Sequence, residues 1–304
     1  MIDMNPSHVR ALGRFLTTCI LATAVLLMPS CSTSKKATVP VQENALLWEV
    51  SGKGLKEPSY VYGTIHMICS VDYRLSDTIT QAFNQSRQLY LELDMDDPAM
   101  MMKSMQLAIM KGKTLKDIFK PEDYSKLEKY VKNNLGMPMM LLNTLKPIAI
   151  TSLLTAKSMP CDKMESYEQH FQDMAKARKI ELKGLETLEY QFGVFDRIPD
   201  SAQARMIMDM IGDDKKQKEE FNQMVEAYKR RDLNALGGQI NDAPDIAGYE
   251  DILLKDRNAN WVPIMEKAMA EMPSFFAVGA GHLPGKDGVL ALLRKAGYQV
   301  KPVY

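Results

Sequence analysis

The sequence predicts an α/β fold in which one β-sheet is built from the N-terminal and C-terminal segments of the chain, with a large, mostly helical insertion between them. Runs of β-prone, largely apolar residues occur near residue 50 and again near residue 280, and turn residues bound them. Between about 97 and 272, nearly every segment has the apolar spacing and the starting residues of helices. The two ends of the folded part are therefore expected to meet in one sheet.

Five segments are expected to be strands of this sheet. The first two flank the turn Gly52-Lys53-Gly54, as in a β-hairpin, and the third places its leucines on one face. The expected strands are residues 46–51, 60–64, 88–94, 274–278 and 298–303. A helix that begins after Ser76 is expected between the second and third strands, and another between the last two.

The insertion is expected to be a block of helices, interrupted by one short strand at residues 180–182. Several helical segments begin with proline or with a serine or aspartate cap. The expected helices are residues 98–111, 121–134, 147–159, 165–179, 201–210, 215–229 and 252–272. Methionine is concentrated in residues 95–110, which is typical of soft packing inside a helical core.

Two of the strands end in the same way, with a glycine followed three residues later by a histidine. Gly63 precedes His66, and Gly279 precedes His282. Glycine allows a sharp bend and a close approach of the backbone. A polar side chain just past such a strand lies at the C-terminal edge of the sheet, where open α/β sheets bind ligands. The pattern therefore predicts that His66 and His282 reach one site.

Glu92, near the end of a strand, is the carboxylate expected to complete this site. Two imidazoles and one carboxylate can hold a catalytic metal with one position left open for water, and a neutral imidazole can also act as a general base. The spacing alone favours a hydrogen-bonded structural cluster over a metal site. His170 is left out, because a lone histidine inside a helix is usually a surface or core residue.

The first thirty residues are expected to be a signal peptide. Arg10 and Arg14 precede an apolar run, residues 15–28, that is too short to span a bilayer comfortably. Residues 27–31 resemble the cleavage site of a bacterial lipoprotein, which would place a lipid on Cys31. The alternative is an ordinary secretory signal with an incidental cysteine.

The rest of the chain divides into a tether and one domain. Residues 31–44 are rich in serine, threonine, lysine and proline, as in a flexible tether, and residues 45–304 form the domain. We expect a lipoprotein of the cell envelope, anchored in the outer membrane and facing the periplasm.

The charge balance sets nucleic acid aside as a partner. The chain has 38 basic and 38 acidic side chains, and removal of the signal peptide takes away two basic side chains and one acidic one. The net charge of −1 that remains gives no long-range attraction for nucleic acid.

Two cysteines remain after Cys19 leaves with the signal peptide and Cys31 takes the lipid. In an oxidising compartment, Cys69 and Cys161 are most simply a disulfide. Because Cys69 lies only three residues beyond His66, a thiolate metal ligand is the competing interpretation.

Several motifs occur in the order found in the TraB/PrgY/GumN family, which the domain resembles from Leu46 onward. They are Tyr62-Gly63-Thr64-Ile65-His66, Glu92 in Leu-Glu-Leu-Asp, Gly184-Leu185-Glu186-Thr187, Arg257-Asn258, Val278-Gly279-Ala280-Gly281-His282-Leu283 and a closing segment around Gly297-Tyr298. That family includes the Tiki proteins, metalloproteases with two Gly-x-x-His motifs and an acidic residue, and it is similar in fold to EreA/ChaN-like proteins.

The resemblance implies that His66, Glu92 and His282 lie at a divalent metal (Mn, Co or Zn), with Glu186 and Arg257 as further site residues. Such a metal lowers the pKa of bound water and polarises a carbonyl. Glu92, if it is not a ligand, or otherwise Glu186, would take the proton. Arg257 would stabilise an oxyanion or pair with Glu186 as scaffold, and the ion pair is favoured.

Two functions follow as expectations. The first is a metal-dependent hydrolase, most simply a peptidase, that acts on a peptide or small-molecule substrate at the cell envelope. The second is a non-catalytic binding or accessory lipoprotein that sequesters a peptide or assists envelope processes. The intact set of His66, Glu92 and His282 favours the first, because a pure binding protein need not keep all three.

Overall fold

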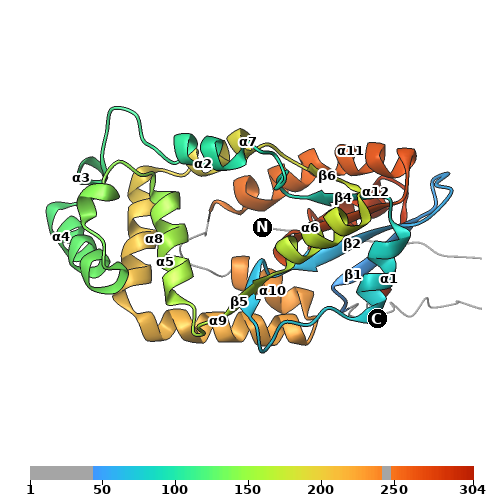
Figure 1. Cartoon of the computed structure of the whole chain (residues 1–304), viewed down its shortest axis with the longest axis horizontal. Helices are drawn as coiled ribbons and strands as arrows, with labels where there is room; N and C mark the ends of the chain where they lie inside the picture. The colour runs from blue at the N-terminus through green and yellow to red at the C-terminus, as the bar shows by residue number, and fades with distance from the viewer. Residues whose placement is uncertain (1–43, 242–247) are drawn as a thin grey trace, which may run out of the picture. The chain divides into compact units, whose positions relative to one another are not determined.

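A computed structural model of the chain describes residues 44–241 and 248–304 (Figure 1). The expected signal peptide, Cys31 and all but the last residue of the tether lie outside the described residues. Within the part that the structure describes, no helix combines the length and the apolar character needed to cross a membrane.

The main sheet has six strands and confirms the predicted α/β class. Its spatial order is β6-β4-β7-β2-β1-β8. The strands are β1 (Leu47–Ser51), β2 (Ser59–Thr64), β4 (Gln88–Leu91), β6 (Glu181–Gly184), β7 (Ser274–Gly279) and β8 (Gln299–Val303). The short strand expected inside the insertion is thus an edge strand of the main sheet, β6, so the sheet is not built from the chain ends alone.

Four neighbouring strands of the sheet are parallel. β2 and β4 each pair in parallel with β7, and β4 also pairs in parallel with β6. β1 is antiparallel to both of its neighbours, β2 and β8. Every residue of β2, β4 and β7 is buried, as expected for strands covered on both faces. The parallel strands end at one edge of the sheet.

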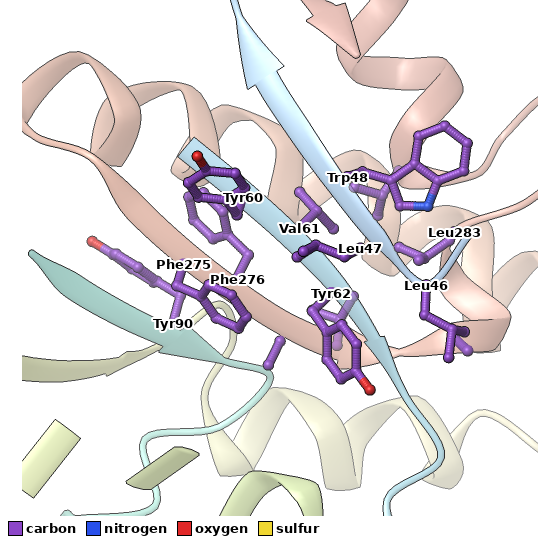
Figure 2. Packing of buried hydrophobic residues seen from close by; sticks show 14 of the residues in the cluster. Leu46, Leu47, Trp48, Tyr60, Val61, Tyr62, Tyr90, Phe275, Phe276 and Leu283 are labelled. Atoms are coloured by element: carbon purple, nitrogen blue, oxygen red, sulfur yellow. The ribbon is translucent and has the colours of Figure 1, made fainter. Parts of the chain in front are cut away.

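Helices from both halves of the chain cover the sheet. They are α1 (Asp77–Gln85), α6 (Tyr167–Arg178), α11 (Asp256–Glu271) and α12 (Val289–Lys295). Phe83 of α1 and Phe171 of α6 both pack on Phe275 of β7, with ring centroids 5.4 and 4.9 Å apart. α11 contacts β7 and α12, and α12 contacts β8. Figure 2 shows the buried side chains of β1, β2, β4 and β7 that these helices enclose.

The insertion contributes a second hydrophobic core. Besides α6 and α11, the helices of the insertion are α2 (Met100–Leu107), α3 (Leu115–Ile118), α4 (Pro121–Tyr130), α5 (Pro147–Ser158), α7 (Leu188–Asp196), α8 (Asp200–Gly212), α9 (Asp214–Lys229) and α10 (Leu233–Asn241). The second core includes Leu115, Leu127, Ile150 and Ile207, which come from α3, α4, α5 and α8. The sequence did not predict α3 or α10.

The expectation for the methionine-rich stretch is wrong in α2. This helix buries none of its residues, and Met101, Met102 and Met105 are 77%, 65% and 66% exposed. Spacing in the sequence indicated an apolar stripe; α2 contacts α7, but the described part of the chain leaves these three methionines exposed.

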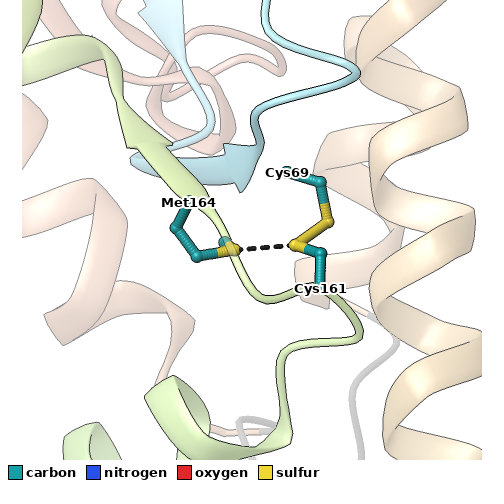
Figure 3. The surroundings of a disulfide bond; sticks show 3 residues. All are labelled: Cys69, Cys161 and Met164. Carbon is teal, nitrogen blue, oxygen red and sulfur yellow. Dashed lines mark hydrogen bonds between the residues drawn. A yellow bond between two sulfur atoms is a disulfide. The ribbon is translucent and has the colours of Figure 1, made fainter.

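A small sheet beside the main one was not predicted. β3 (Met67–Cys69) pairs antiparallel with β5 (Met164–Ser166), and a disulfide joins Cys69 to Cys161 (Figure 3). The two Cα atoms of this disulfide lie 5.9 Å apart. The disulfide favoured from the sequence is therefore present, and Cys69 has no free thiolate with which to bind a metal.

We predict that this disulfide stabilises the domain substantially. It closes a loop of 92 residues, for which the chain-entropy model gives about 4–5 kcal/mol as an upper figure. The double variant Cys69→Ser/Cys161→Ser should lose about 2–5 kcal/mol of unfolding free energy in chemical denaturation. Wild-type protein with reductant is the matched control and should behave like the variant. Two free thiols in protein taken from its native compartment would contradict the prediction.

Candidate functional site

Residues that follow four parallel strands converge at the C-terminal edge of the sheet. His66 comes after β2, Glu92 after β4, Glu186 after β6 and His282 after β7. His66 and His282 line a cavity of about 550 Å³, whose other residues come largely from α9, α10 and the end of α5. This placement is the one that open α/β sheets use for ligands.

One oxygen of Glu92 lies between the two histidines. The Nε2 atoms of His66 and His282 are each 3.9 Å from Glu92 Oε1. The two nitrogens can therefore be no further apart than twice that distance. The backbone N–H of Gly279 donates to the same oxygen at 2.9 Å, so the end of β7 holds the carboxylate in place.

Gly279 is needed here for its lack of a side chain. A Cβ atom at this position would lie 3.1 Å from His66 Nε2 and 3.3 Å from Glu92 Oε1. Such contacts would push both groups away from the backbone. The glycine of the second Gly-x-x-His motif thus lets the strand end approach the site closely, as the sequence predicted for a glycine in this position.

Glu168, at the start of α6, orients His66. Its Oε1 lies 2.8 Å from His66 Nδ1 and accepts from the Thr64 hydroxyl at 2.5 Å. The Ser166 hydroxyl donates to the other oxygen at 3.2 Å. His66 itself has a φ of 57°, in the left-handed region that non-glycine residues rarely adopt. This backbone conformation and Glu168 together direct Nε2 toward Glu92.

Asn258 of α11 orients His282. Its side-chain nitrogen donates to the backbone oxygens of His282 and Asp287, at 3.3 and 3.0 Å. Its oxygen therefore faces His282 Nδ1, at 2.7 Å, and Nδ1 must carry the proton that is donated. The His282 ring also packs on Trp261, with centroids 4.4 Å apart. His282 is thus a buried imidazole with an unprotonated Nε2.

Arg257 joins three site residues. Its Nη2 donates to Glu92 Oε2 at 2.6 Å and to Glu186 Oε1 at 2.7 Å, and its Nε donates to Glu186 as well. Its Nη1 lies 3.1 Å from His282 Nε2 and 3.2 Å from the Leu253 carbonyl. All five N–H groups of the guanidinium are engaged. Trp261 adds an indole N–H to Glu186 at 2.9 Å and a ring face to the guanidinium.

The surroundings shift the pKa values of the two histidines in opposite directions. Burial lowers the pKa of His282 to about 3; the charge of Glu92 opposes this effect, and the charges of Arg257 and His66 add to it. Desolvation acts to lower the pKa of His66, but the hydrogen bond and charge of Glu168 raise it to about 9. Because 58% of the His66 side chain is exposed, its desolvation is only partial. Burial acts to raise the pKa of Glu92, yet His282, Arg257 and His66 lower it to about 2.

His66, Glu92 and His282 are residue types that bind divalent cations, but their donor atoms do not surround a common point. Two imidazoles and a carboxylate face one another, which is a known set of metal ligands. Arg257, however, bonds both His282 and Glu92. Among residues 44–241 and 248–304, no group of three or more His, Cys, Asp or Glu side chains has an arrangement that could hold a metal ion.

The structure brings together all five residues that the sequence analysis placed at the site, which are His66, Glu92, Glu186, Arg257 and His282. Sequence reasoning missed Glu168, Asn258 and Trp261. Asn258 follows Arg257 directly in one of the motifs, so the signal was present but unassigned. His170 lies elsewhere: it bonds Glu165 at 2.9 Å and stacks on Tyr73.

Comparison with known proteins gives two kinds of match. The model of the TraB/PrgY/gumN family matches residues 46–302, nearly the whole described domain. The zebrafish (Danio rerio) proteins Metalloprotease TIKI1 and Metalloprotease TIKI2 are each 22% identical to this chain, over 318 and 322 residues. These matches cover 85% of this chain, which spans only 63% and 61% of the two relatives. No solved structure matches. The chain belongs to the TraB/PrgY/gumN family.

Proposed function

We propose that this protein is a hydrolase that cleaves peptide bonds, with its catalytic centre at His66, Glu92 and His282. The observation that carries the proposal is the meeting of these three side chains at the C-terminal edge of the sheet, beside a cavity of about 550 Å³. Cavities of this size accommodate small ligands or a few residues of a peptide. The two relatives named as metalloproteases support the reaction class.

We further propose that His66, Glu92 and His282 hold a divalent cation, which would be Mn, Co or Zn. When bound, such a cation lowers the pKa of a coordinated water and polarises the scissile carbonyl. Glu168 and Asn258 keep the Nε2 atoms of His66 and His282 directed at Glu92. Hydrogen-bonding partners of this kind usually tune ligand basicity and orientation.

The carboxylates considered as the catalytic base are poorly placed for proton transfer. Glu92, with its pKa lowered to about 2, is a weak proton acceptor at neutral pH. Glu186 is 3% exposed and bonds Arg257, Trp261 and Gln191. We therefore assign Glu92 to cation binding and the Arg257–Glu186 ion pair to the scaffold, the role favoured for Arg257 from the sequence.

A binding or accessory protein is the second candidate. The observation in its favour is the complete engagement of Arg257, which leaves no N–H free for a developing oxyanion. In that case the cluster is structural and the cavity holds a peptide without cleaving it.

We also propose that Cys31 carries a lipid that anchors the protein at the outer membrane, facing the periplasm. The lipoprotein-like cleavage site at residues 27–31 supports this proposal.

The catalytic centre is tested by removing its members one at a time. His66→Ala, His282→Ala and Glu92→Gln should each lower cleavage of a peptide library, followed by mass spectrometry, by about 100-fold or more, since loss of a supporting residue alone costs 10–100-fold at such sites. His170→Ala is the matched control and should cleave normally. Wild-type protein that cleaves nothing with added Mn²⁺, Co²⁺ or Zn²⁺ would favour the binding protein instead.

The anchor is tested with Cys31→Ala. This substitution should block the incorporation of labelled fatty acid and release the protein from the membrane fraction, because the thiol is the attachment point. Cys19→Ala, which changes a cysteine within the signal peptide, serves as the control. Equal labelling of wild type and Cys31→Ala would rule the lipoprotein out.

A further inference from the structure

Arg257 bonds one of the atoms that a cation at the proposed centre would use, His282 Nε2, and it also bonds the second oxygen of Glu92, Oε2. Its Nη1 is 3.1 Å from His282 Nε2, and its Nη2 is 2.6 Å from Glu92 Oε2. The Nε2 of His282 has one lone pair, and a guanidinium cannot accept a hydrogen bond. The contact is therefore an N–H···N hydrogen bond that uses this lone pair.

The direction of that bond follows from Asn258. The Asn258 amide nitrogen donates to two backbone carbonyls, so its oxygen faces His282 Nδ1 and fixes the proton there. The lone pair on His282 is thus on Nε2, available either to Arg257 or to a cation. It cannot serve both at once.

The guanidinium position is built into the fold. Arg257 is only 7% exposed, and its five N–H groups all have acceptors. Glu186, which holds its far side, is fixed in turn by Trp261 and Gln191. A permanent positive charge is therefore held beside the place that a divalent cation would occupy, and the two charges repel.

We infer that Arg257 is an internal competitor of the divalent cation at this centre. In one state the guanidinium bonds His282 Nε2, and in the other a cation takes this nitrogen while Arg257 keeps its bonds to Glu186. The apparent cation affinity is reduced by the fraction of molecules in the first state. This inference rests on the proposed cation at the centre and assigns its regulation to Arg257.

The test measures cation binding rather than turnover. In the double variant Arg257→Met/Glu186→Gln, methionine removes the competing charge, and glutamine avoids a buried unpaired carboxylate. Equilibrium dialysis against Mn²⁺, Co²⁺ or Zn²⁺ should show at least one of these ions bound ten times more tightly than by wild type. Adding His282→Ala should abolish the gain.

The matched control is Arg197→Met/Asp256→Asn, which removes an ion pair of 2.7 Å on the exposed surface. It makes the same change in charge and should leave cation affinity unaltered. Thermal melting checks folding. If Arg257→Met/Glu186→Gln does not fold, Arg257→Gln/Glu186→Gln takes its place, because an amide can still bond Glu92 but carries no charge.

Affinity in the double variant that is unchanged, weaker or absent for all three ions overturns the inference. Peptide cleavage by wild type separates this result from a failure of the proposed function. Cleavage without a gain in affinity would leave the hydrolase standing and remove the competitor. A gain in affinity without any cleavage would support Arg257 as the competitor and remove the proposed hydrolase.

Discussion

Two successive residues of α11 hold the ends of three strands in one place. Arg257 pairs with Glu92 after β4 and with Glu186 after β6, while Asn258 bonds the segment that follows β7. A buried guanidinium is tolerable only with such partners, and removing one member of a buried pair typically costs about 3–5 kcal/mol. The start of α11 and the three strand ends therefore cannot be placed independently.

The His66 side of the centre is organised by different means. The disulfide joins Cys69 of β3 to Cys161, just before β5, and β5 leads directly into α6, which carries Glu168. The backbone N–H of Tyr167 also donates to the His66 carbonyl at 3.3 Å. His66 is thus held from β5 and the start of α6 rather than from α11. Its left-handed backbone conformation is maintained by these surroundings.

The parts that sequence predicts well are those whose geometry is local. The strands β2, β4 and β7 are short apolar runs, and a residue just past a parallel strand lies at a known edge, which is why His66, Glu92 and His282 could be placed. Glu168 and Asn258 lie on helices. The periodicity of apolar residues does not show which face of a helix contacts the site, because this depends on tertiary packing. The three-residue strands β3 and β5 are too short to show any period, and Gly237-Gly238 lowers the helical propensity of α10.

The cavity beside the centre has walls of two origins. The reactive side chains come from the edge of the sheet, whereas Phe221, Met224 and Leu236 come from α9 and α10 of the insertion. The hydrogen bonds that orient the two histidines involve Glu168 and Asn258 and none of those three wall residues. Substitutions of Phe221, Met224 or Leu236 can therefore change the shape of the cavity without removing a hydrogen bond that orients His66 or His282. In the proposed hydrolase, substrate preference would therefore depend on these wall residues, whereas the chemistry would depend on the side chains at the ends of the strands.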